Sequence, residues 1–185
     1  MKWVNSAGGP LLFLDEVLLS DWGGAAGGYA EQSDYERACL AGDLIVSTDY
    51  ERACLAGDLI VPISISNGCG IVLNDEPLQT AWMPSKKHGQ SFFVRLKYAE
   101  NENSIIRHLE QVPESIFRQE ALPITVTSGR CILFDSALPG LDFRKGDFLE
   151  LMLEPGEHEI RTGFFEPDAE TSLVIHEISI LMAHI

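Results

Sequence analysis

Hydrophobic and polar residues alternate along several short segments of this chain, which is the pattern of half-buried β-strands. Residues 92–98 follow the pattern, and residues 173–182 place a second row of apolar side chains on one face. Along the whole chain the pattern predicts about nine strands against one helix of substantial length. We therefore expect a mainly β fold, at the border of the α+β class, with antiparallel sheets and short helical turns.

A turn signal lies at Asn67-Gly68, between two apolar segments. Asn-Gly in this setting is typical of a type I′ hairpin turn, because both central residues of that turn need positive φ. A two-residue loop at these positions pairs Ile65 with Gly70, and the ladder continues from there. We predict a hairpin with this register.

Two further strand pairs are predicted in the second half of the chain. Residues 124–134 are apolar on both sides of Ser128-Gly129 and have the pattern of a tight hairpin. Residues 148–165 turn at Glu154-Pro155-Gly156-Glu157, where Pro and Gly stand as a type II turn favours. The return strand from His158 is mostly polar, which predicts an exposed or edge strand.

One segment has the spacing of a helix. Ile105, Leu109 and Val112 recur at intervals of three and four residues, Asn101 stands before them as a helix cap, and Pro113 ends the pattern. The apolar spacing predicts a helix with one apolar side.

The sequence DYERACLAGDLIV occurs twice, at residues 34–46 and at residues 49–61. Each copy follows a hydroxyl residue and carries a Glu three positions after it, which is the capping box of a helix start. A Gly then ends the helix, and Leu-Ile-Val continues as a strand. The copies lie within a single domain, residues 1–185, by the length of the chain. A duplication without function, an enlarged binding surface and a handle for domain swapping remain open.

The chain carries a net charge of −15, and the excess of acidic residues lies in residues 1–62 and 147–185. Such a charge argues against binding to DNA or RNA, because the phosphate backbone attracts basic surfaces. It fits either plain solubility or a basic protein partner. The first sixteen residues have neither the pattern of a signal peptide nor that of a membrane span, so we expect a cytoplasmic protein without membrane contact.

The sequence holds no G-x-S-x-G, H-E-x-x-H or C-x-x-C motif, and we expect no catalytic residue, no metal and no cofactor. Its four cysteines are expected to be buried thiols: Cys39, Cys54, Cys69 and Cys131. His176 lies on an apolar strand face and is expected to be a hydrogen-bonded core residue. The carboxylates around the turn at residues 154–157 favour a solvated acidic face over a metal cluster.

Several short motifs together resemble the immunity protein 21 family, predicted antidotes to toxins of bacterial polymorphic systems. These motifs are W-x-x-S-x-G-G-P at 3–10, Trp22-Gly23, DYERAC, N-D-E-P at 74–77, L-F-D-S-A at 133–137 and L-x-P-G-x-H-x-I at 153–160. The resemblance implies a predominantly β fold, a cytoplasmic antidote and inhibition by binding instead of catalysis. The duplicated DYERAC departs from the family pattern, in which we expect that motif once.

On this basis the chain is expected to bind a cognate toxin, a basic domain such as a nuclease, and to block it sterically and electrostatically. Tryptophan is enriched among the residues that contribute most to binding, so Trp22 is a candidate contact. The alternative is that Trp22 is a core residue. The residues expected to contact the partner are Trp22, Asp34, Tyr35, Glu36, Arg37, Asp49, Tyr50, Glu51, Arg52, Glu154, Glu157 and Glu159.

Two other classes of function remain open. One is a small-molecule-binding or enzymatic β domain with an internal pocket, to which polar groups such as His176 would contribute. The other is a protein that self-assembles into a homo-oligomer through an unpaired strand edge. A large apolar cavity would favour the first of these, and a solid core with an acidic surface would favour the toxin-binding hypothesis.

Overall fold

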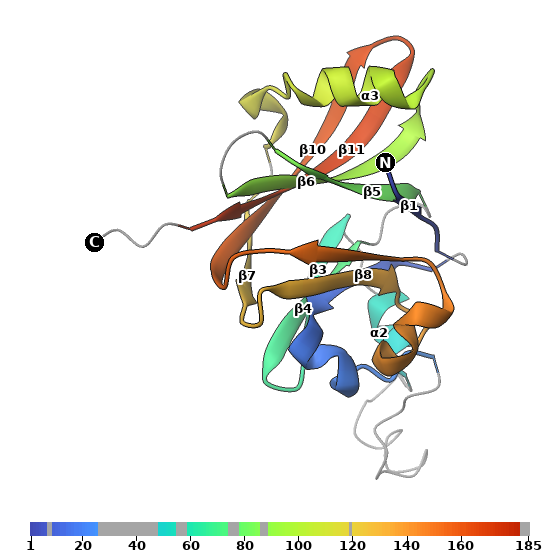
Figure 1. The fold of residues 1–185 in the computed structure, drawn as a ribbon, viewed down its shortest axis with the longest axis vertical. Helices are drawn as coiled ribbons and strands as arrows, with labels where there is room; N and C mark the ends of the chain where they lie inside the picture. The colour runs from blue at the N-terminus through green and yellow to red at the C-terminus, as the bar shows by residue number, and fades with distance from the viewer. Residues whose placement is uncertain are drawn as a thin grey trace, which may run out of the picture. The chain divides into compact units, whose positions relative to one another are not determined.

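The computed structural model describes residues 1–6, 9–25, 48–54, 59–73, 78–85, 89–118 and 120–181. Within them the chain is mainly β, as predicted, and its strands form two antiparallel sheets (Figure 1). The chain divides into two compact units, and each unit is made of segments that are separated in the sequence. One unit comprises residues 1–5, 78–131 and 149–185, and the other comprises residues 6–77 and 132–148.

The first unit contains a six-stranded sheet with the strand order β1-β5-β6-β11-β10-β7. Its strands are β1 (Trp3–Val4), β5 (Gln79–Pro84), β6 (Gln90–Tyr98), β7 (Leu122–Val126), β10 (Gly156–Asp168) and β11 (Thr171–Ile180). The two longest, β10 and β11, form a hairpin in which Arg161 pairs with Glu177 and Thr162 pairs with His176. The alternating segments predicted at 92–98 and 173–182 are therefore neighbours, β6 and β11.

Helix α3 (Glu102–Leu109) covers one face of this sheet, and a 3-10 turn, η2 (Glu114–Ile116), follows it. Asn101 caps α3 as predicted, because its Oδ1 accepts a hydrogen bond from Ser104 N at 3.0 Å. The core between the helix and the sheet consists of Phe92, Val94, Ile105, Leu109, Phe165, Leu173 and Ile175. We call this face of the sheet the α3 face.

The other sheet has five strands in the order β3-β4-β2-β8-β9. They are β2 (Leu11–Asp15), β3 (Ile60–Ile65), β4 (Gly68–Leu73), β8 (Arg130–Asp135) and β9 (Phe148–Met152). Around them lie α2 (Asp49–Cys54) and two 3-10 turns, η1 (Glu16–Asp21) and η3 (Gly140–Lys145). The core of the second unit consists of Leu12, Leu14, Trp22, Ala53, Ile63, Ile65, Val72, Ile132, Phe134 and Phe143.

The hairpin predicted around Asn67-Gly68 exists, but its register was predicted wrongly. The loop residues are Ser66 and Asn67, so Ile65 pairs with Gly68 and not with Gly70. Ser66 carries the positive φ, at 48°. A Cβ atom at Gly68 would lie 2.8 Å from the side chain of Leu18, so this glycine permits close packing instead of forming the turn.

The two other predicted strand pairs are wrong. The segments joined by Ser128-Gly129 are β7 and β8, which belong to different sheets. Likewise β9 lies in the five-stranded sheet, whereas β10 lies in the six-stranded sheet. The predicted edge strand is also wrong, because β10 pairs with β11 on one side and β7 on the other. Its polar residues alternate with buried ones, such as Ile160 and Thr162.

Candidate partner-binding surfaces

The second copy of the repeat forms α2 and the start of β3, with the capping box that the sequence predicts. Thr48 N donates to Glu51 Oε2 at 2.9 Å, and Glu51 N donates to Thr48 Oγ1 at 3.1 Å. These two bonds satisfy backbone groups that a helix start otherwise leaves without partners. The first copy, with Asp34, Tyr35, Glu36 and Arg37, lies outside the described residues.

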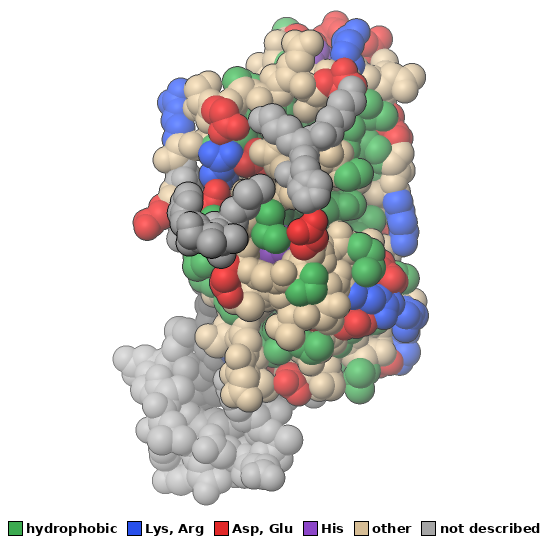
Figure 2. All heavy atoms as spheres, turned by 60° about the vertical axis from the view of Figure 1, so that its left-hand side comes forward, with side chains coloured by type: hydrophobic (Ala, Val, Ile, Leu, Met, Phe, Trp, Pro, Cys, Tyr) green, Lys and Arg blue, Asp and Glu red, His purple; other side chains and the backbone are tan. Residues whose placement is uncertain are grey.

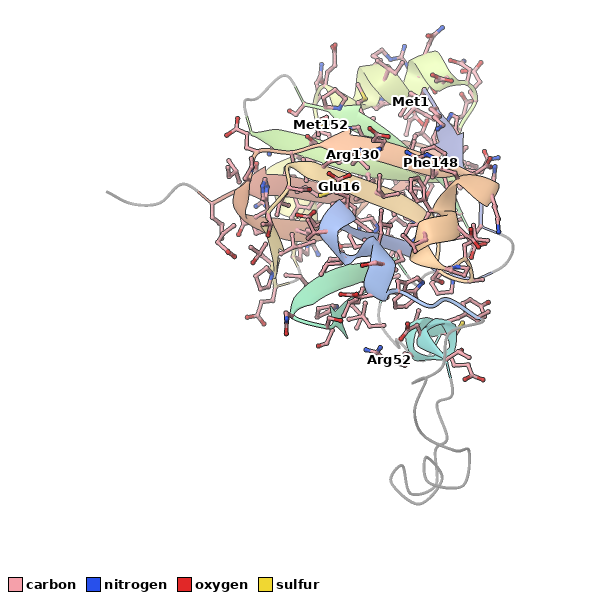
Figure 3. The ribbon with its side chains drawn as sticks, turned by 60° about the horizontal axis from the view of Figure 1, so that its bottom comes forward. Met1, Glu16, Arg52, Arg130, Phe148 and Met152 are labelled. Carbon is pink, nitrogen blue, oxygen red and sulfur yellow. The ribbon has the colours of Figure 1, made fainter. Side chains whose placement is uncertain are left out.

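Asp49 and Arg52 connect α2 to its surroundings. Asp49 Oδ2 accepts from Gly23 N at 2.8 Å, and its Oδ1 accepts from Arg52 Nη1 at 2.8 Å. Arg52 also donates from Nη2 to the backbone oxygen of Ser64 on β3, at 2.6 Å. Figure 3 shows Arg52 extending from α2. Both side chains are thus engaged within the chain, and a partner would meet them in fixed positions.

Tyr50 is also held in place. A hydrogen bond with Cys54 and partial burial raise the pKa of the Tyr50 hydroxyl. Its ring lies so near the backbone of Gly9 that a Cβ there would be 2.5 Å from the hydroxyl oxygen. Glu51 is the exposed carboxylate of this helix. As a surface, α2 is small, and several of its side chains are held by contacts within the chain.

Trp22 lies in the core and is only 2% exposed. Its Nε1 donates to the backbone oxygen of Ser136 at 2.9 Å, which satisfies the polar end of the indole. The next residue, Gly23, donates to Asp49. A role for Trp22 in recognition would therefore be indirect, through the loop and helix that it positions.

The turn at residues 154–157 does not join a hairpin, because β9 and β10 belong to different sheets. Two of the acidic residues predicted around it still lie on the same face of β10. Glu157 and Glu159 lie on β10, where residues two apart point to the same side. Glu157 accepts from Thr125 Oγ1 at 2.9 Å and is exposed. Glu154 is exposed at the turn, and its backbone oxygen is hydrogen-bonded to the His158 ring.

This side of β10 is the α3 face. Arg161 follows Glu159 on it and pairs across the ladder with Glu177, which is 2% exposed. The Glu177 carboxylate accepts from Arg161 Nε at 3.1 Å and from Gln90 Nε2 at 2.6 Å. Arg161 Nη2 donates to Glu114 as well, at 3.0 Å. Burial alone would lower the pKa of Arg161, but the two carboxylates raise it and keep the guanidinium charged.

A cleft of about 120 Å³ opens beside this ion pair. Its apolar wall comes from β5, β6 and the end of α3, and includes Met83, Phe92 and Leu109. Its polar side includes Glu110, Glu114 and Glu177. We call the five glutamates on this part of the α3 face the acidic end: Glu110, Glu114, Glu157, Glu159 and Glu177. Glu110, Glu114 and Glu177 were not predicted from the sequence, because they stand singly at a helix end, after a proline and inside an apolar strand.

Carboxylates do not gather into a metal site in the part of the chain that the structure describes. On the face shown in Figure 2, acidic side chains stand apart, with apolar and a few basic side chains between them. Glu150 is held by Arg130 through two hydrogen bonds of 2.9 Å. Figure 3 shows where Arg130 lies. The wide spacing of these acidic side chains is typical of a solvated surface and not of a metal site.

His176 is a core residue, as predicted. It is 0% exposed, its Nδ1 is hydrogen-bonded to Thr162 Oγ1 at 2.9 Å, and it does not line the cleft. Among the cysteines that the structure describes, the expectation of a buried thiol holds for Cys131, whereas Cys54 is exposed and Cys69 is half-buried. Cys39 lies outside the described residues. Burial raises the pKa of the Cys69 thiol, which keeps it protonated and poorly reactive.

Comparison with known proteins places most of the chain in a known family. The family model described as Immunity protein 21 matches residues 42–171. The match takes in the whole second copy of the repeat and only the last residues of the first. No curated protein and no solved structure matches the chain. Among the described residues, no helix is long and apolar enough to cross a membrane.

Proposed function

Because the chain belongs to the immunity protein 21 family, we propose that it binds a cognate bacterial toxin and neutralises it by covering the toxin's active site or substrate path. Neutralisation by binding needs no reacting group in the inhibitor, and we assign no catalytic residue, metal or cofactor. The protein acts in the cytoplasm, and its partner is a basic toxin domain such as a nuclease.

The acidic end of the α3 face is the observation that carries this proposal. Three of its glutamates, Glu110, Glu114 and Glu177, line a cleft that also has apolar walls. Apolar anchors inside a polar rim are the usual anatomy of a protein–protein interface. Glu110, Glu114 and Glu157 are exposed, so their charges act over a distance on an approaching partner. A basic domain is attracted before contact, which raises the association rate.

The surface of α2 provides a second contact region. Glu51 is exposed there, and Asp49, Tyr50 and Arg52 are fixed by their contacts with the chain. Fixed side chains lose little conformational entropy when a partner binds. Of the residues named from the sequence, we retain Asp49, Tyr50, Glu51, Arg52, Glu154, Glu157 and Glu159 as direct contacts; the four in the first copy lie outside the described residues.

A small-molecule function has less support. The cleft of about 120 Å³ is smaller than the roughly 300–1,000 Å³ of common ligand pockets. His176, the polar group on which that alternative depended, lies elsewhere in the core. The cleft suits a side chain of a protein partner better than a whole metabolite.

The first test is copurification of the protein with the product of the adjacent gene, at low and at high salt. We expect a complex with a protein that carries a toxin domain, weakened as salt screens the acidic end. Purification of this chain alone, together with no protection of cells that express the toxin, would overturn the proposal.

Charge reversal at the acidic end should slow association with the toxin. Replacing Glu157→Lys together with Glu159→Lys is expected to lower the association rate by about ten-fold or more at low salt, and less at high salt. Stopped-flow mixing with the purified toxin measures the rate. The matched control is Glu166→Lys on β10 with Glu170→Lys in the turn that follows it, which makes the same charge change beyond the other end of the strand.

The control separates local contact from overall charge. If the acidic end faces the toxin, the control pair slows association much less than the test pair. Equal slowing by both pairs would mean that only net charge matters. No slowing by either would remove the acidic end from the interface while leaving α2 as a contact region.

A further inference from the structure

The cleft beside the ion pair of Arg161 and Glu177 combines an apolar wall with carboxylates, which suits one long cationic side chain. We infer that it receives a lysine of the protein partner, with the aliphatic stem along the apolar wall and the ammonium group against the carboxylates. Since this lysine belongs to the toxin, the role rests on the proposed function and adds to it the chemical group that the cleft selects.

The apolar wall fits the aliphatic stem of a lysine. Phe92 and Leu109 belong to the buried core of the α3 face, and Met83 and Val112 pack against that core while they remain half-buried. All four side chains line the cleft. Methylene groups that lie along such a wall lose contact with water, and each of them contributes favourably to binding. The wall therefore favours a side chain with a long aliphatic part.

The polar side of the cleft favours a cation. Three of the described residues that line it are glutamates, and none of them is a lysine or an arginine. Glu110 and Glu114 are exposed, whereas Glu177 is only 2% exposed. A carboxylate that is shielded from water attracts a positive charge more strongly than an exposed one at the same distance. A cationic head group therefore meets carboxylates both at the surface and deeper in the cleft.

The buried carboxylate of Glu177 is held in place within the chain itself. Gln90 Nε2 donates to its Oε2 at 2.6 Å, and the amide oxygen of Gln90 accepts from Ser85 Oγ at 3.2 Å. Arg161 donates to the other oxygen, Oε1, from Nε at 3.1 Å and also from Nη2. Because the carboxylate is already fixed, a partner that binds to it orders few additional groups, and the entropic cost of binding is low.

The same hydrogen bonds favour lysine over arginine. A carboxylate offers about four acceptor positions, two on each oxygen. Among the described contacts, Oε1 of Glu177 accepts twice from Arg161 and Oε2 accepts once from Gln90, which leaves one position on Oε2. A guanidinium group pairs best with both oxygens of one carboxylate, whereas an ammonium group needs only one acceptor from each. The buried carboxylate therefore accepts the head group of lysine more readily.

The first test uses a small probe and no toxin. Nα-acetyl-lysine methylamide is titrated into the full chain, and two-dimensional proton–carbon NMR follows the methyl groups of Met83, Leu109 and Val112. We expect these methyl signals to shift with a dissociation constant of the order of 1 mM. The norleucine analogue, which lacks the ammonium group, and the arginine analogue should each bind at least about five-fold more weakly. Equal binding of either analogue, or no shift at about 20 mM of the lysine probe, would overturn the assignment.

Charge removal at the cleft separates local contact from overall charge. Glu110→Gln together with Glu114→Gln removes two charges with little change in shape, and should weaken binding of the lysine probe by about five-fold or more at low salt. The matched control is Glu166→Gln with Glu170→Gln, two residues that do not line the cleft. The control pair should leave probe binding unchanged within about two-fold. Equal weakening by both pairs would mean that net charge alone attracts the probe, and the cleft would not be its site.

The second test identifies the lysine in the complex with the toxin. Val112→Trp fills the cleft without a change in charge, and the pair Glu110→Gln and Glu114→Gln serves as a second variant with an open cleft. Acetylation with acetic anhydride, followed by mass spectrometry, should show one toxin lysine that the wild type protects and that both variants leave reactive.

The two proposals fail in different ways. If the complex forms and every toxin lysine reacts equally in the wild type and the variants, the cleft has another occupant, while the toxin-binding function stands. If no complex with a toxin forms although the lysine probe binds, the proposed function fails, and a toxin is not the source of the lysine.

Discussion

Lowering the pH from 6.5 towards 3 is expected to destabilise the fold through His176, by about 1.4 kcal/mol for each pH unit. The pKa of His176 is lowered to about 3, first by burial and then by the positive charge of Arg95. In the unfolded chain the same imidazole titrates near its ordinary pKa of about 6.5. Below that pH the unfolded chain binds a proton that the folded protein excludes, so stability present above pH 6.5 is lost as the pH falls.

The geometry explains why the folded protein excludes this proton. His176 lies on β11 between β6 and β10, and it is 0% exposed. Its Nδ1 is hydrogen-bonded to the Thr162 hydroxyl, and its Nε2 has no hydrogen-bond partner among the residues that the structure describes. Arg95, on the same face of β6, is 1% exposed. A second positive charge in this place would be neither hydrated nor neutralised by a carboxylate on these strands.

The measurement is urea unfolding of the wild type and of His176→Gln at pH 7 and at pH 5. The wild type should lose about 2 kcal/mol more than the variant over this interval, because glutamine does not titrate. Other groups titrate equally in both proteins and cancel in the comparison. Thr162→Val serves as the control: it removes the hydrogen bond, lowers stability at both pH values by about 1 kcal/mol and keeps the pH dependence. Identical pH dependence in the wild type and His176→Gln would contradict the prediction.

The strands of this protein could be predicted from sequence, but the sheets to which they belong could not. Alternation of apolar residues is a local property, and it located β6 and β11. Pairing depends on contacts between distant segments. Gly129, with φ at +80°, marks a bend that the sequence pattern cannot distinguish from a hairpin turn. The bend leads from β7 in one sheet to β8 in the other.

For the candidate surfaces too, local features could be predicted from the sequence and contacts between distant segments could not. The capping box of α2 lies within four consecutive residues, so the spacing of Thr48 and Glu51 was enough to predict it. The ion pair of Arg161 and Glu177 depends on the register of β10 against β11, and the cleft also needs the end of α3. In the sequence, Glu177 is one polar residue in an apolar strand. Its burial and its two hydrogen-bonding neighbours become evident only when three strands are side by side.

Replacing Trp22 by alanine is expected to destabilise the protein by about 3 to 5 kcal/mol, the cost common to large aromatic residues removed from a core. Trp22 packs in the core of the second unit and is 2% exposed. It also fixes the backbone at two points: its Nε1 donates to Ser136 O at 2.9 Å, and its own backbone oxygen accepts from Gly140 N at 2.8 Å. The side chain therefore joins η1 to the segment after β8.

Trp22→Phe separates packing from hydrogen bonding and serves as the matched variant. Phenylalanine retains most of the apolar contact but leaves the backbone oxygen of Ser136 without the indole N–H, so a smaller loss of about 1 to 3 kcal/mol is expected. Urea unfolding gives both values, and toxin binding measured under fully folding conditions should be nearly unchanged in Trp22→Phe. If Trp22→Phe abolished binding without loss of stability, Trp22 would be a direct contact, and its loop would have to open to expose it. A loss of stability with binding retained would establish that Trp22 acts as a core residue and not as a direct contact of the toxin.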